Sequence, residues 1–191
     1  FQIHDLTING PEDIVRIDDK EVKEKIKDNF LIYAEVKNKY ISYHSGIISK
    51  KDSFTLYAPY ETYRFRVDGV NESVVIRKNS VDFNKINELH SILSNNSIEF
   101  YYNNRLVGIN RLNSPLNQKS DQNIFIGGRE YRYVFVGEIR NLEIINTNNV
   151  ETYIISKKTL KVENFNSNII GFISFNNTQI NKIKLTLKYE K

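Results

Sequence analysis

The stretch NIFIGGREYRYVFVGEIRNLEIIN (residues 123–146) carries the clearest structural pattern in this chain. Its two apolar runs lie on either side of Gly127 and Gly128, and successive glycines permit a tight turn. A third glycine, Gly137, lets neighbouring backbone approach closely. The pattern predicts strands over residues 123–126 and 134–145. Four side chains of the second segment are expected to fill a core: Phe135, Ile139, Leu142 and Ile144.

The composition extends this prediction to the whole chain. Among 191 residues there are 26 Ile, 13 Val, 12 Tyr and 11 Phe, against 12 Leu, 2 Ala and no Met. β-Branched and aromatic residues favour strands, which argues against a helical bundle. The 25 Asn suit turns between many short strands. We expect a single all-β domain, an antiparallel β-sandwich.

Strand patterns recur along the chain at spacings of about 8 to 12 residues. The pairs Asp68-Gly69 and Asn103-Asn104 mark hairpin turns. The charged run at residues 18–29 is interpreted as a solvated loop or surface helix, residues 79–94 as less regular, and residues 110–122 as a loop. The other predicted strands are residues 1–8, 14–17, 30–37, 40–43 with 47–48, 54–57, 63–67, 73–77, 97–102, 105–109, 153–155, 169–175 and 180–189.

Charge and missing residue types limit the function classes. With 27 Lys and Arg against 23 Asp and Glu, the net charge is +4 and the basic residues are scattered, so nucleic acid is not an expected partner. The chain has no Cys, which excludes disulfides, a thiolate nucleophile and Cys-bound zinc. No apolar run reaches the roughly 18 residues that cross a bilayer. The initial Phe1 and the lack of Met indicate a processed product or an excised piece of a longer chain.

Three segments, in this order, resemble the laminin G-like branch of the concanavalin A-like lectin/glucanase fold. The first is NFLIYAEVK (residues 29–37), where Glu35 replaces the family's aromatic residue. The second is NNSIEFYYNNRLVG (residues 95–108), similar to the family's "YVNG" and "kLV" hairpin. The third is the opening stretch, similar to the family's ending "IGG, variable loop, F-x-G-x-I-x-x-L-x-I". The resemblance implies a jelly-roll domain over residues 1–146. Residues 147–191 lie outside the match, and we expect them to add C-terminal strands packed on the same domain, with a small extension as the alternative.

The same fold includes glucanases, and retaining glycosidases need two carboxyl groups about 5 to 5.5 Å apart. The sequence offers no Glu-x-Asp-x-x-Glu pattern and no acidic pair at i, i+2 within a confident strand. Glu138 and Glu143 are five residues apart, which places them on opposite faces of a strand unless a bulge intervenes. The histidines His4, His44 and His90 are far apart and have no acidic residue at ligand or triad spacing. We therefore expect no enzymatic activity.

Calcium is the metal that the resemblance suggests, because laminin G-like modules often hold one at the sandwich rim with Asp, Asn and backbone oxygens. Candidate ligands are Asp68, Asn71 and Glu72 in one turn, or Asp121 with Asn123. All of these residues are also ordinary turn formers. No other cofactor is expected.

Two loops, residues 57–64 and 129–133, combine aromatic and cationic side chains. Rings stack on sugar faces, and Arg binds carboxylates and hydroxyls. The alternative is that the tyrosines cap the sandwich ends and the arginines solubilise its rim. The candidate ligand-binding patch consists of Tyr60, Arg64, Arg129, Tyr131 and Arg132.

The resemblance implies a non-catalytic binding or adhesion module, a lectin-like domain that recognises a glycan or a protein. The alternative is a structural subunit of a surface layer, a fibre or a virion, as a capsid or tail component, which self-assembles through edge strands and exposed tyrosines. Both functions fit a protein that is secreted, displayed on a cell or part of a particle surface.

Overall fold

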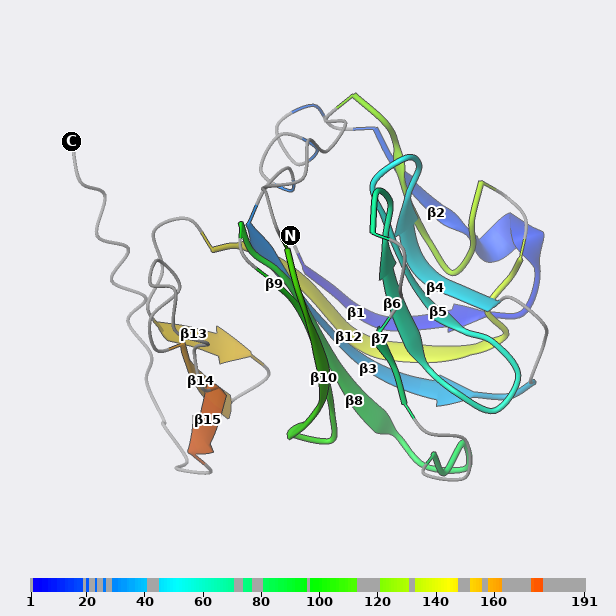
Figure 1. Cartoon of the computed structure of the whole chain (residues 1–191). Helices are drawn as coiled ribbons and strands as arrows, with labels where there is room; N and C mark the ends of the chain where they lie inside the picture. Colours follow the sequence, from blue (N-terminus) through cyan, green and yellow to red (C-terminus); the bar gives the residue numbers. More distant parts are fainter. Residues whose placement is uncertain are drawn as a thin grey trace.

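Two six-stranded antiparallel sheets face each other in this protein (Figure 1). The computed structural model describes residues 2–18, 20, 23, 26, 29–40, 45–70, 74–76, 81–95, 97–112, 121–130, 133–147, 152–155, 158–162 and 173–176. Sheet A has the order β1 (Gln2–Ile8), β12 (Gly137–Asn146), β3 (Phe30–Asn38), β8 (Asn87–Leu93), β9 (Ser97–Tyr102) and β10 (Arg105–Arg111). Sheet B has the order β2 (Val15–Ile17), β11 (Ile124–Ile126), β4 (Ser45–Lys50), β5 (Phe54–Ala58), β6 (Arg64–Val67) and β7 (Val74–Val75).

The core lies between the two sheets, because alternate side chains of each strand point toward the opposite sheet. Phe30, Ile32 and Ala34 of β3 are fully buried there, and so is Phe54 of β5. The ring centroids of Phe30 and Phe54 lie 4.8 Å apart, so the contact joins sheet A to sheet B. Each fully buried ring of this kind stabilises the fold by about 1.5–3 kcal/mol. The all-β antiparallel sandwich predicted from the sequence is confirmed.

Strand β8 was not predicted, although it lies inside sheet A between β3 and β9. Its sequence, NELHSIL, contains a single β-branched residue. Asn87 and Ser91 share the inward parity of Leu89 and Leu93, so polar residues interrupt the apolar side of the strand. The expectation of irregular structure over residues 79–94 is therefore wrong for residues 87–93. These residues form a strand because pairing with β3 and β9 outweighs their weak local preference for strand structure.

Other strand boundaries differ from the prediction by a few residues. Of the strand expected at residues 40–43 and 47–48, residues 47–48 belong to β4, Tyr40 lies outside it, and residues 41–43 lie outside the described residues. The loop expected from residue 110 begins later, since β10 continues to Arg111. Most of the charged run at residues 18–29 and all of residues 180–189 lie outside the described residues. Within that charged run, Lys23 and Ile26 are buried, so these two positions are not solvated.

A β-bulge interrupts the pairing of β12 with β3. Ile139 pairs with Val36, but Asn141 pairs with the next residue along β3, Glu35, so Arg140 is an extra residue. As a result Glu138 and Glu143, opposite Lys37 and Tyr33, lie on the same face of sheet A. Four residues of β3 separate the two positions, about 13 Å at the usual rise per residue. This exceeds the roughly 5–9.5 Å between the carboxyl groups of glycosidases.

Three further strands form their own antiparallel sheet, β13 (Thr152–Ile155), β14 (Lys158–Val162) and β15 (Ile173–Asn176). The sequence did not predict β14. That residues 147–191 pack on the same domain stays a prediction. Among the described residues there is no helix with the length and apolar character needed to cross a membrane.

Candidate functional site

A hollow of about 180 Å³ opens on the face of sheet B that points away from the core. Strands β4, β5 and β6 supply four of its lining residues. The turn after β6 and the loop between β11 and β12 supply the other three. We call this hollow the sheet B pocket. It is lined by Gly46, Thr55, Tyr57, Arg66, Asp68, Arg129 and Tyr133.

The alternation of β5 and β6 places polar side chains in the pocket. Thr55 and Tyr57 alternate with core residues of β5, and Arg64 and Arg66 alternate with core residues of β6. The register pairs Thr55 with Arg66 and Tyr57 with Arg64. Directly opposed side chains on one face of an antiparallel pair lie next to each other. Each arginine of β6 therefore stands beside a hydroxyl-bearing side chain of β5.

Glycines allow the loop after β11 to lie against β4. Gly127 has a φ of +83°, and a Cβ there would lie 2.6 Å from Ile8 Cδ1. A Cβ on Gly46 would lie 2.9 Å from the carbonyl carbon and oxygen of Gly128. The predicted turn at Gly127-Gly128 is present, and the positive φ of Gly127 and the close approach at Gly46 favour glycine at these two positions.

Hydrogen bonds then hold this loop in place beside β4. The Gly127 N–H donates to Ile47 O at 2.8 Å, and the Gly46 N–H donates to Tyr133 O at 2.7 Å. Ser49 Oγ donates to Gly128 O at 3.0 Å. These bonds bring Arg129 and Tyr133 to the edge of the pocket from a segment far from β5 and β6 in sequence.

The pocket is positively charged. Arg66 Nε lies 3.6 Å from Asp68 Oδ1, so the two charges balance. Within the part of the chain that is described, no carboxylate pairs with Arg129, and the adjacent Glu130 instead pairs with Lys51 at 3.5 Å. The pocket therefore presents one guanidinium that a carboxylate neutralises and one that has no carboxylate partner among the described residues, together with the rings of two tyrosines.

The predicted ligand-binding patch and this pocket overlap in part. Arg129 lines the pocket. Arg64 is on the same face of sheet B, opposite Tyr57. Tyr60 lies in the turn after β5 with 53% of its surface exposed. Tyr131 and Arg132 lie outside the described residues. That the five residues bind a ligand stays a prediction.

Sequence reasoning did not select Tyr57, Arg66 and Tyr133 for the patch, although signals for them existed. The alternation of Arg64 and Arg66 already indicates that both face away from the core. Tyr57 and Tyr133 belong to the two loops that the sequence singled out. What was missing is the juxtaposition, because it depends on the register of β5 with β6 and on the return of the glycine-containing loop to β4.

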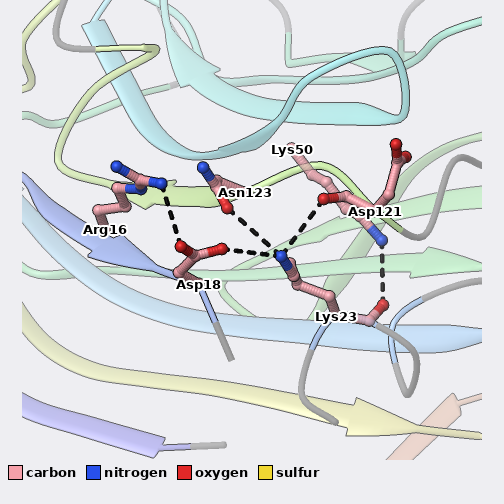
Figure 2. Close-up of polar contacts among 6 residues, drawn as sticks. All are labelled: Arg16, Asp18, Lys23, Lys50, Asp121 and Asn123. Atoms are coloured by element: carbon pink, nitrogen blue, oxygen red, sulfur yellow. Dashed lines mark hydrogen bonds and ion pairs between the residues drawn. The ribbon is translucent and has the colours of Figure 1, made fainter. Parts of the chain in front are cut away.

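The second calcium candidate, Asp121 with Asn123, surrounds the ammonium group of Lys23 (Figure 2). Lys23 Nζ donates to Asp18 Oδ1 at 2.9 Å, to the main-chain oxygen of Asp121 at 3.3 Å and to Asn123 Oδ1 at 3.4 Å. Arg16 Nη2 reaches the other carboxylate oxygen of Asp18 at 3.1 Å. These oxygens therefore face a cation that belongs to the chain.

The Asn123 side-chain amide forms hydrogen bonds within this cluster in either of its two orientations. With the amide turned over, its nitrogen donates to Asp18 Oδ1 at 2.6 Å and its oxygen accepts from Arg16 Nη2 at 2.8 Å. The hydrogen bond from Lys23, followed by the charge of Lys23, lowers the pKa of the Asp18 carboxyl group. The carboxylate thus stays ionised and paired at neutral pH.

A second lysine, Lys50, holds the same segment. Lys50 is 1% exposed, and its Nζ donates to Lys23 O at 3.0 Å (Figure 2). It also donates to Ile26 O at 3.1 Å. A buried ammonium group is stable only with such hydrogen bonds. Lys50 therefore fixes the main chain that carries Lys23.

The first calcium candidate is less complete. Asp68 pairs with Arg66, and Asn71 and Glu72 lie outside the described residues. Over the described ranges there is no group of three or more His, Asp or Glu side chains that could hold a metal. Calcium at either position stays a prediction.

Polar side chains also form a network on the outer face of sheet A. His4 Nδ1 lies 2.7 Å from Asn141 Oδ1, and Asn141 Nδ2 donates to Glu35 Oε2 at 2.6 Å. The hydroxyl of Tyr33 donates to the other oxygen of Glu35. Glu35 lies opposite Glu88 across β3 and β8. Because these two residues belong to different strands, a sequence pattern of acidic pairs within one strand does not detect them. Because both oxygens of Glu35 accept hydrogen bonds, its carboxylate is engaged in the structure of the sheet.

Comparison with known proteins gives the fold. No family model and no curated protein match the chain. The carbohydrate-binding module CBM40 of Ruminococcus gnavus IT-sialidase matches with a TM-score of 0.62 and 13% identity, over 77% of this chain and 92% of that chain. That module has also been solved bound to alpha2,3 sialyllactose.

In two other solved structures, the match covers a smaller share of the known chain. The leech intramolecular trans-sialidase has a TM-score of 0.64 and 12% identity, over 77% of this chain and 26% of that chain. The receptor binding domain of the botulinum neurotoxin C/D mosaic serotype has a TM-score of 0.62 and 16% identity, over 75% of this chain and 39% of that chain. The fold is a jelly-roll β-sandwich. The narrower laminin G-like assignment stays a prediction.

Proposed function

We propose that this protein is a non-catalytic glycan-binding module whose sheet B pocket takes a sugar that carries a carboxylate. The observation that carries this proposal is the meeting of Arg66 and Arg129 with Tyr57 and Tyr133 in one hollow. Guanidinium groups bind carboxylates through parallel N–H···O bonds. Tyrosine rings offer a flat apolar surface with a polar tip. A sugar acid presents the matching charge and ring face.

Charge balance favours an anionic ligand over a neutral one. Asp68 already neutralises Arg66, which leaves the Arg129 guanidinium to attract the ligand. An exposed charge pair of this kind weakens as salt screens it. The affinity for an acidic glycan is therefore expected to fall with ionic strength.

The fold matches support the same ligand class. Among the structures that share the fold is a carbohydrate-binding module solved with alpha2,3 and with alpha2,6 sialyllactose. Sialyllactose ends in a sugar with a carboxylate group. A module of this kind would act where glycans are displayed, on an extracellular or particle surface.

Isothermal titration of the full chain with 3′-sialyllactose tests the proposal, with lactose as the uncharged comparison. Saturable binding of sialyllactose and none of lactose is expected. Arg129→Ala should weaken binding about 10- to 100-fold, because it removes a charged hydrogen-bond donor. Arg129→Lys should not retain wild-type affinity, because the lysine ammonium group lacks the planar guanidinium geometry that binds both carboxylate oxygens.

The control is Arg105→Ala, which removes an exposed arginine at the start of β10 on the other sheet. Circular dichroism confirms that each variant is folded. Equal weakening by Arg105→Ala would show a nonspecific charge effect. If the protein binds no acidic glycan on a glycan array, the proposed function is wrong.

A further inference from the structure

Tyr60, three residues beyond the pocket residue Tyr57, occupies a backbone conformation that tyrosine rarely adopts. Tyr60 has a φ of +52° and is 53% exposed. It is the first central residue of the turn from Pro59 to Thr62, a position with positive φ that Gly, Asn and Asp usually fill. Non-glycine residues held in this region by their surroundings concentrate at ligand sites.

The surrounding residues hold this turn firmly. The Thr62 N–H donates to Pro59 O at 3.2 Å, and Thr62 Oγ1 donates to the same oxygen at 3.0 Å. Thr62 is buried, and the next residue, Tyr63, is fully buried in the core. The turn is therefore anchored on its inner side while the Tyr60 ring stays in contact with solvent.

Arg64 lies between this turn and the pocket. It stands directly opposite Tyr57, which lines the pocket. Its Nε is buried and has no hydrogen-bond partner among the residues that the structure describes. Arg64 therefore stands on the pocket's face of sheet B, at the end of β6 nearer the turn, with a guanidinium nitrogen that no described residue engages.

We propose that Arg64 and Tyr60 form a second subsite, which binds the sugar that follows the one held in the sheet B pocket. This inference rests on the proposed function and deepens it, because it makes the ligand an oligosaccharide. Tyr60 is three residues beyond Tyr57, so their Cα atoms lie within about 10 Å. The second ring would stack on Tyr60 while Arg64 donates to hydroxyl groups between the two sugars.

Titration of the full chain with two ligands tests this subsite, the methyl glycoside of N-acetylneuraminic acid and 3′-sialyllactose. The wild-type chain should bind the trisaccharide about 3- to 10-fold more tightly than the monosaccharide, the gain typical of one aromatic contact. Tyr60→Asn should abolish that gain and leave the affinity for the monosaccharide unchanged. Asn tolerates the left-handed backbone, so this variant removes the ring without disturbing the turn.

Two further variants separate the ring from its hydroxyl and from Arg64. Tyr60→Phe keeps the ring and should retain the gain. Arg64→Ala should reduce the gain for the trisaccharide alone. The subsite is overturned if Tyr60→Asn binds both ligands as the wild type does, or if it weakens both equally. If the wild type binds neither ligand, the proposed function itself fails, which is a different result from losing the gain.

Discussion

The hydroxyl of Tyr63 donates to Asn38 Oδ1 at 2.7 Å, a hydrogen bond that ties the residue before β6 in sheet B to the end of β3 in sheet A. Asn87 Nδ2 donates to the same hydroxyl at 3.2 Å, and Tyr102 donates to Asn87 Oδ1 at 2.6 Å. Burial raises the pKa of Tyr63, so its hydroxyl keeps the proton that it donates. The two sheets are thus joined by polar bonds as well as by the apolar core.

Tyr63→Phe should destabilise the fold by about 1–3 kcal/mol, because it takes the donor from the buried Asn38 Oδ1 and one of three acceptors from Asn87 Nδ2. Urea denaturation of the full chain measures the change. The matched control is Tyr40→Phe, which removes a hydroxyl from a side chain that is 64% exposed. That control should change the free energy of unfolding by less than about 0.5 kcal/mol. Equal effects of the two substitutions would contradict the role of Tyr63.

Gly46→Ala should disturb the sheet B pocket without removing any of its polar side chains. The added Cβ would meet the backbone of Gly128, which can move only if the loop carrying Arg129 moves. We expect destabilisation of about 1–3 kcal/mol and weaker binding of 3′-sialyllactose. Gly10→Ala is the control, because the Cβ there would meet only the flexible side chain of Glu12. Retention of wild-type affinity in Gly46→Ala would show that the loop position does not matter.

Asp68→Asn should strengthen binding of an acidic glycan. The substitution removes the carboxylate that neutralises Arg66 and leaves two guanidinium groups for the ligand. Titrations at two salt concentrations should show a several-fold gain that shrinks as salt rises. The comparison variant is Asp82→Asn, which breaks an exposed pair with Lys85 away from the pocket. Weaker binding in Asp68→Asn would mean that the carboxylate itself contacts the ligand.

Acid should weaken the corner of the fold that contains Asp18. Its pKa is lowered in the folded protein, so the ion pair with Lys23 contributes stability above the unfolded-state pKa of about 3.9. That contribution is lost as the pH falls through the lowered folded-state value. Melting temperatures between pH 6 and pH 2.5 should therefore fall more steeply for the wild type than for Asp18→Asn. Parallel curves would contradict this assignment.

The fold class could be predicted because composition and alternation act along the whole chain. Buried and half-buried residues alternate along β5, and β3 begins with a run of five buried apolar residues; both patterns are typical of strands. Strand β8 could not be recognised because Asn87 and Ser91 occupy inward positions, and its stability comes from its neighbours. A local pattern cannot report hydrogen bonds that other strands supply.

The candidate site could be predicted only as two separate loops. The sequence indicated Arg129 as a candidate ligand-binding residue, but the register that puts Arg66 beside Thr55 is a property of the sheet. The Lys23 cluster had no local signal at all, since Lys23 binds Asp121 and Asn123 from about a hundred residues away. The alternative of an assembly subunit stays a prediction that light scattering of the purified chain would test.

The bulge of β12 restricts how this protein can change in length. Asp5 of β1, with a φ of +49°, lies opposite Arg140, so the two neighbouring strands each carry one extra residue at the same level. Loss of Arg140 alone would make the pairing of β12 with β3 regular but would leave Asp5 of β1 without a residue opposite it. Deletions here should be accepted only in pairs, one in each strand, although the two positions are 135 residues apart in sequence.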